Sequence, residues 1–181
     1  FQAEDGIRDC LLSRGLGDVY KRQTLVVEQN DEGGSRSREE HEAEILSQMK
    51  EYNVELVVLS GYMRLLSPLF LSDWTNRVVN IHPSFLPHFP GAHAHRDVLA
   101  SQTTITGCTV HLVDEGMDTG TILAQRTVPV FKDDDESTLS TRVKVEEHRL
   151  YPQVLTWIAE GRVHLTEGGV SIVGAEGPQV G

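Results

Sequence analysis

A continuous apolar run constrains the fold of this chain more than any other sequence feature. Residues Val54–Ser60, VELVVLS, have the length of a β-strand and are rich in β-branched side chains. Runs of this kind are typical of strands that are covered on both faces, as in a parallel sheet. The segment Arg77–Ile81 predicts a second buried strand of the same type.

Segments with helical periodicity alternate with the predicted strands. Apolar residues recur at helical spacing from Arg38 onward, and strands that alternate with helices are typical of the α/β class. We therefore expect a Rossmann-like, mostly parallel sheet flanked by helices. Further strands are expected at 24–28, 108–113 and 121–128, and further helices at 65–74, 96–102 and 139–158, with Ser137 as an N-cap. Loops are expected at 30–37 and 83–90, and no element beyond Leu165.

Length and local composition predict the domain organisation. The chain has 181 residues, which is the size of one domain. Residues 1–23 show no sustained period and resemble translated linker sequence, so we expect a foreign-looking or disordered leader. The domain is expected at 24–165, and the glycine-rich segment 166–181 is expected to be a flexible tail.

Composition and charge disfavour several classes of protein. Lysine and arginine total 16 against 27 aspartate and glutamate residues, and the resulting net charge of −11 disfavours a nucleic-acid partner. No apolar run approaches the roughly 18 residues that a membrane-spanning helix needs. Cys10 and Cys108 form neither a disulfide framework nor a metal-binding pair, and no secretory signal is recognisable, so we expect a cytoplasmic protein.

Three polar residues could carry chemistry on a carbonyl group. Asn80 and His82 are separated by one residue, so in a strand their side chains project to the same side. Asn could donate to an oxyanion, and His titrates near neutral pH. Asp118, in the loop DEGMDTG, could orient His82 and hold a proton-carrying water. Taken singly, these residues also fit a turn cap, an ordinary histidine and a solvated turn.

Other kinds of site receive less support. Five of the eight histidines lie within thirty residues, but no metal-binding motif is present, and we expect no metal. A serine nucleophile at Ser60 or Ser84 lacks the GxSxG elbow. No glycine-rich phosphate loop of the GxGxxG or GxxxxGK[ST] type occurs.

Three longer motifs resemble phosphoribosylglycinamide formyltransferase, a folate-dependent family of purine synthesis. They are LSGYMRLLSP at 59–68, NIHPSFLPHFPGAHAHR at 80–96 and HLVDEGMDTG at 111–120. The segment EEHRLYP at 146–152 also resembles the C-terminal helix of that family. The motifs follow one another in the family's order over about residues 38–165.

The resemblance implies a formyltransferase fold and transfer of a formyl group from the cosubstrate 10-formyltetrahydrofolate to the amine of glycinamide ribonucleotide. Asn80 and protonated His82 would stabilise the oxyanion, and Asp118 with an ordered water would move the amine proton to the folate nitrogen. Arg38 would face the glutamate tail of the folate, and Glu147 would contact the ribonucleotide. The folate would lie, largely through backbone groups, against Met63, Arg64, Leu65, Leu66, Val113, Asp114, Glu115, Gly116 and Met117. The implied partners are these small molecules, and the implied assembly is a monomer or homodimer.

The N-terminus departs from the family pattern. Family members begin with a strand and a glycine- and serine-rich loop that holds the substrate phosphate. Here residues 1–23 stand in that place, so we expect a truncated member with its catalytic residues present and its ribonucleotide affinity impaired. The lost strand would also expose apolar sheet surface.

Three alternatives stay open at this point. Formyltetrahydrofolate hydrolase shares the Asn, His and Asp, although PGAHAHR and EEHRLYP favour the transferase. Methionyl-tRNA formyltransferase carries a second domain for which this chain lacks the length. An inactive folate-binding fragment is the main alternative.

Overall fold

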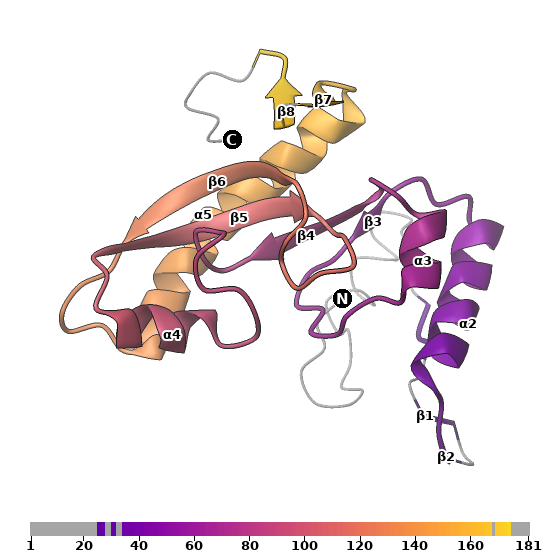
Figure 1. The fold of residues 1–181 in the computed structure, drawn as a ribbon, viewed down its shortest axis with the longest axis horizontal. Helices are drawn as coiled ribbons and strands as arrows, with labels where there is room; N and C mark the ends of the chain where they lie inside the picture. The colour runs from indigo at the N-terminus through magenta and orange to yellow at the C-terminus, as the bar shows by residue number, and fades with distance from the viewer. Residues whose placement is uncertain (1–24, 28–29, 32–33, 168, 175–181) are drawn as a thin grey trace, which may run out of the picture.

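The fold was analysed in a computed structural model, which describes residues 25–27, 30–31, 34–167 and 169–174. Its main helices are α2 (Arg38–Glu51), α3 (Pro68–Asp73), α4 (Ala94–Ser101) and α5 (Glu136–Ala159). Its central strands are β3 (Val57–Val58), β4 (Val78–His82), β5 (Ile105–Leu112) and β6 (Ile122–Pro129). Two short hairpins, β1 (Asn30–Asp31) with β2 (Gly34–Ser35) and β7 (Val163–Thr166) with β8 (Gly169–Ile172), complete the described elements. The α/β class is therefore confirmed (Figure 1).

The central sheet is mixed, so the prediction of a mostly parallel sheet is wrong for the described strands. The strand order is β3-β4-β5-β6, and only β3 and β4 run parallel. Strand β5 is antiparallel to both of its neighbours. Strands β5 and β6 are joined directly by the loop 113–121, and neighbouring strands joined without a crossover run antiparallel.

Strand β3 is shorter and more exposed than its sequence predicts. The run Val54–Ser60 was expected to be covered on both faces, but β3 contains only Val57 and Val58, and Val58 is 40% exposed. In the described sheet β3 is an edge strand with β4 as its one neighbour. Val54, Val57 and Leu59 instead pack partly against side chains of α3, so the apolar run serves helix packing as well as the sheet.

Two apolar clusters hold these elements together. Helix α5 covers one face of the sheet, and its Leu139, Val143 and Val154 pack against Val79 and Val110. Helices α2 and α3 lie side by side beyond the β3 edge (Figure 1). The cluster there is formed by the buried residues Leu66, Phe70, Leu71, Trp74 and Val78, with Ile45, Leu46 and Met49 of α2 packed against it.

Several boundaries differ from the sequence predictions. Asp135, not Ser137, caps α5, because its carboxylate accepts the Thr138 N–H at 2.8 Å and Ser137 lies inside the first turn. The predicted loop at 30–37 contains the β1–β2 hairpin, and residues 25–27 do not form the predicted strand. The prediction of no element beyond Leu165 is wrong, since β8 pairs with β7.

The leader, Thr24, Glu28 and residues 175–181 lie outside the described residues. None of the described helices has the length and apolar character needed to cross a membrane.

Burial makes a clear prediction for Cys108 of β5. Its side chain is fully buried, and burial together with the charges of Glu147 and Glu146 raises the pKa of the thiol to about 12. Because the thiolate is the reactive form, native Cys108 should not react with iodoacetamide at pH 8. The test is mass-spectrometric alkylation of a Cys10→Ser variant, with urea-unfolded protein as the fully labelled control. Labelling of the native chain at the rate of a free thiol would contradict the prediction.

Candidate active site

The structure gathers Asn80, His82 and Asp118 on the face of the sheet that points away from α5. Asn80 and His82 lie on β4, whose alternate residues Val79 and Ile81 pack toward α5. By the alternation of a strand, Asn80 and His82 therefore project away from α5. Asp118 reaches His82 from the loop between β5 and β6, and its other carboxylate oxygen lies 3.6 Å from the Nε2 of His111, which contacts Asn80.

His82 lies between two acceptor oxygens. Its Nε2 donates to the Phe89 carbonyl at 2.9 Å, and its Nδ1 lies 3.3 Å from Oδ2 of Asp118. The ring is therefore held on two sides, by its hydrogen bond to the Phe89 carbonyl and by the neighbouring carboxylate of Asp118. Both side chains are largely buried, with 6% and 13% of their surface exposed, so water screens the pair only weakly.

Backbone geometry fixes the position of Asp118. Its φ of 56° lies in the left-handed region, and its Oδ2 accepts the Gly91 N–H at 2.8 Å. The loop that carries it is held by Asp114, whose Oδ1 accepts from the Gly116 N–H and the Thr119 hydroxyl. Gly120 closes the loop where a Cβ would lie 1.8 Å from the Leu112 carbonyl. The glycine-flanked acidic loop thus has a structural reason for its composition.

His111 orients the Asn80 amide and was not singled out from the sequence. It lies directly opposite Asn80 across β4 and β5, with Nε2 at 3.3 Å from the Asn80 Nδ2. Its Nδ1 donates to the Leu112 carbonyl at 2.8 Å, which leaves Nε2 as an acceptor for the amide. Burial lowers the pKa of His111, whereas the Leu112 carbonyl and the charge of Asp118 act to raise it. The net lowering favours the neutral ring. Only the antiparallel register, which the sequence did not predict, would have identified it.

A buried hydrogen-bond network anchors the loop that supplies Phe89 and Gly91. The Thr109 hydroxyl donates to the Ser84 carbonyl at 2.7 Å and accepts the Leu86 N–H at 3.1 Å. The Gln125 amide donates to both the Thr109 hydroxyl and the Leu86 carbonyl. The Ser84 hydroxyl donates to the His88 carbonyl at 2.6 Å and shares this proton with the Phe89 carbonyl at 3.0 Å, beside His82. The loop therefore presents an acceptor to His82 and a donor to Asp118 at fixed positions.

The residues predicted to hold the folate fall into two groups. Met63 and Leu65 are 59% and 47% exposed, whereas Leu66 is buried in the cluster with Phe70. Leu66 could therefore meet a ligand only through its backbone. In the second segment Val113 packs partly against the same cluster, and the residues after it are half-buried or exposed, namely Asp114, Glu115, Gly116 and Met117.

Arg38 and Glu147 are not joined to the three residues by any contact in the described part of the chain. Arg38 is the first residue of α2 and has a buried Nε without a hydrogen-bond partner. Glu147 lies on α5, which covers the opposite face of the sheet. Burial raises the pKa of Glu147, and the charges of His148 and Lys144 act in the opposite direction.

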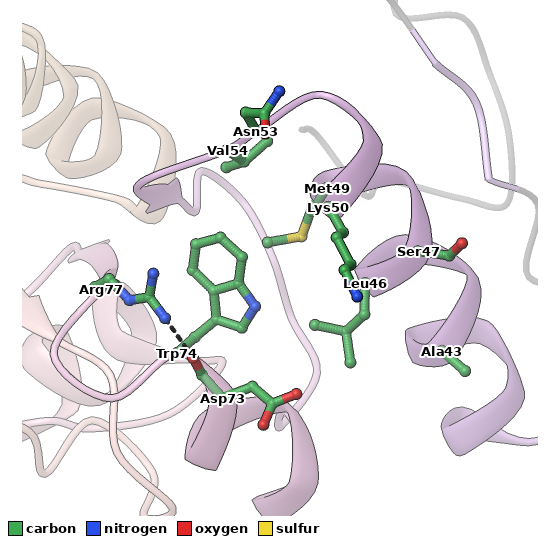
Figure 2. Close-up of a pocket in the computed structure, with 10 residues that line it drawn as sticks. All are labelled: Ala43, Leu46, Ser47, Met49, Lys50, Asn53, Val54, Asp73, Trp74 and Arg77. Atoms are coloured by element: carbon green, nitrogen blue, oxygen red, sulfur yellow. Dashed lines mark hydrogen bonds between the residues drawn. The ribbon is translucent and has the colours of Figure 1, made fainter.

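Two further features bear on ligand chemistry. Among the described residues, no group of three His, Cys, Asp or Glu side chains could hold a metal ion. A groove of about 550 Å³ lies between α2 and the end of α3, and its lining includes the apolar Leu46, Met49 and Trp74 and the basic Lys50 and Arg77 (Figure 2). It shares no lining residue with the Asn80 cluster.

The sequence of the chain matches a known protein family. The sequence profile of the formyl transferase family matches residues 14–155. The phosphoribosylglycinamide formyltransferase of Escherichia coli is 40% identical over 145 residues, which cover 80% of this chain and 68% of that enzyme. The chain spans only 9% to 14% of the length of the trifunctional purine biosynthetic proteins that it also matches.

Solved structures are similar over much of the chain. A phosphoribosylglycinamide formyltransferase from Coxiella burnetii has a TM-score of 0.80 at 32% identity, covering 92% of this chain and 77% of that one. A formyltetrahydrofolate deformylase from Pseudomonas syringae has a TM-score of 0.78 at 26% identity, covering 88% of this chain and 52% of that one.

The lowered pKa of His111 predicts a dependence of stability on pH. The unfolded chain takes up a proton at this residue near pH 6.5, whereas the folded protein resists it. The free energy of unfolding should therefore fall as pH drops below about 6.5, by at most about 1.4 kcal/mol per pH unit from this group, until the folded pKa is passed. In His111→Gln, which retains an acceptor for Asn80, this contribution should disappear.

Urea unfolding of the unmodified chain and the variant between pH 7.5 and 5.5 measures the difference. His164→Gln, at an exposed histidine of β7, is the matched control and should keep the slope of the unmodified chain. An unchanged slope in His111→Gln would refute the prediction.

Proposed function

The chain belongs to the phosphoribosylglycinamide formyltransferases of the formyl transferase family, and from this membership we propose that it transfers a formyl group from 10-formyltetrahydrofolate to the amine of glycinamide ribonucleotide. One observation carries the proposal. His82 lies between the Phe89 carbonyl and Asp118, beside an Asn80 amide that His111 orients. This arrangement combines a hydrogen-bond donor, an imidazole and a proton acceptor within one cluster.

In the proposed reaction the amine nitrogen attacks the formyl carbon. The carbonyl oxygen becomes an oxyanion, which receives the second N–H of Asn80, since the first is used by His111. The positive charge of His82 stabilises the same oxygen electrostatically. Asp118 accepts the proton that the amine loses and, through a water, returns this proton to the folate nitrogen as the bond from that nitrogen to the formyl carbon breaks. One C–N bond forms, between the amine and the formyl carbon, and one breaks, between the folate nitrogen and the same carbon, so no covalent enzyme intermediate is needed.

We assign folate binding to the segments 63–66 and 113–117. Exposed apolar side chains at Met63, Leu65 and Met117 support this assignment, because a pteridine ring buries apolar surface on binding. Arg38 is assigned to the folate carboxylates: its Nη2 lies 3.4 Å from Glu39, but its buried Nε lacks a partner, so part of its forked donor set remains for a ligand. Glu147 is assigned to a part of the ribonucleotide away from the reacting amine, since it lies on α5, and burial raises the pKa of its carboxyl.

A second candidate, hydrolysis of the formyl folate, is supported by the similarity to the deformylase from Pseudomonas syringae. Both reactions would use the same oxyanion chemistry and differ in the nucleophile. A third outcome is a chain that binds folate without turnover. The ribonucleotide dependence of formyl release separates the three.

The deciding assay follows release of deformylated folate by the purified 181-residue chain, with and without glycinamide ribonucleotide. We expect release that requires the ribonucleotide. Release without it would favour hydrolysis, and folate binding without release in either condition would favour an inactive fragment.

Substitution of Asp118 tests the assigned chemistry. Asp118→Asn keeps an acceptor for the Gly91 N–H but removes the charge opposite His82 and the proton acceptor. We expect kcat to fall by about 10²- to 10⁴-fold in a protein that still folds. Single-turnover formyl transfer measures this, with circular dichroism as the fold check. Asp133→Asn, at an exposed loop carboxylate, is the control and should keep full activity. A loss of less than about threefold in Asp118→Asn would exclude the assigned role.

A further inference from the structure

The segment Ser60–Leu66, here called the cofactor loop, has an unusual pattern of hydrogen bonding. Among the described residues its backbone N–H and C=O groups form no hydrogen bonds. Tyr62 and Leu66 pack into the cluster around Phe70, while Met63 and Leu65 are exposed. Free backbone groups are available to a ligand, but they also leave the backbone of the loop unrestrained by hydrogen bonds of its own.

The start of the loop is fastened by Tyr151 of α5. Its hydroxyl donates to the Leu59 carbonyl at 2.6 Å and to the Val79 carbonyl at 3.0 Å. Tyr151 is 9% exposed, and burial raises the pKa of its hydroxyl, which therefore keeps the proton that it donates. The residue after Val79 is Asn80. Tyr151 thus ties the beginning of the loop to the strand that carries the proposed oxyanion donor.

The end of the loop is fastened by Glu42 of α2. Its carboxylate is 2% exposed, and both oxygens accept the Ser67 N–H, at 3.0 and 3.2 Å. Ser67 in turn caps α3 by accepting the Phe70 N–H at 3.2 Å. A carboxylate is costly to bury, so its placement at this amide is a strong local constraint. Helix α2 also begins at Arg38, and Glu42 therefore links the loop to the residue assigned to the folate tail.

We propose that Tyr151 and Glu42 are positioning residues that clamp the two ends of the cofactor loop and so set the affinity for the formyl folate. This inference rests on the proposed function, because the loop is taken as the folate site. A loop fixed at both ends loses less conformational entropy when a ligand binds its free backbone groups. Neither residue needs to touch the folate for this effect.

The clamp is tested with Tyr151→Phe and Glu42→Gln. Tyr52→Phe and Glu51→Gln are matched controls, because both residues are exposed near the end of α2 and neither forms a hydrogen bond in the described structure through its side chain. In each clamp variant we expect the KM for the formyl folate to rise about fivefold to tenfold, from the loss or weakening of one hydrogen-bonded anchor. The kcat and the KM for the ribonucleotide should change by less than about twofold. The anchors affect folate binding equally in the ground state and in the transition state, so their loss raises only the KM for the folate.

A second measurement does not depend on turnover. Trypsin cleavage after Arg64, inside the loop, should be about fivefold faster in both clamp variants, whereas cleavage after Arg96 at the start of α4 should be unchanged. Equal acceleration at the two sites, or an unchanged rate after Arg64 in both clamp variants, would overturn the clamp. Equal rises in the KM values of both substrates would also overturn it. Absence of turnover by the unmodified chain counts against the proposed function instead, and the cleavage comparison still decides the clamp.

Discussion

The Thr109 hydroxyl is the interaction on which the arrangement of the site depends. It is fully buried beneath the loop 83–91, where it donates to the Ser84 carbonyl and accepts from the Leu86 N–H and the Gln125 amide. Because every group in this network has a partner, no buried polar atom of the network carries the roughly 1–3 kcal/mol cost of an unmade hydrogen bond. The loop is thereby held in one conformation. That conformation supplies the Phe89 carbonyl to His82 and the Gly91 N–H to Asp118.

The two parts of the proposed site differ in how far hydrogen bonds fix their polar groups. The cluster of Asn80, His82 and Asp118 is surrounded by fixed donors and acceptors, which suits groups that must be preorganised toward a developing charge. The cofactor loop has free backbone groups between two anchored ends, which suits a segment that must form hydrogen bonds with a ligand. Tyr151 connects the two parts, because its hydroxyl meets both Leu59 and Val79.

The sequence predicted the parts of this structure that depend on local pattern. Strand β4 and the long helix α5 follow from periodicity, and strand alternation alone places Asn80 and His82 on one face. The antiparallel pairing of β5 with β4 is a property of the chain's path, and no local pattern encodes it. His111 was therefore missed, since its position opposite Asn80 appears only once the register is known. Asp118 was chosen for its glycine-flanked loop, but its approach to His82 depends on the Gly91 N–H, which no side-chain pattern reveals.

Charge balance explains why the site must act at short range. The chain carries a net charge of −11, yet the proposed substrates are anions, so the overall field opposes their approach. The Asp118 carboxylate lies 3.3 Å from the His82 Nδ1, so it offsets at close range the positive charge that the proposed reaction assigns to His82, and the combined field falls off quickly with distance. Stabilisation of an oxyanion then depends on contact with the Asn80 N–H and the near edge of His82. The rigid network around Thr109 is therefore required by the electrostatics, because a displacement of about 1 Å would forfeit much of this short-range stabilisation.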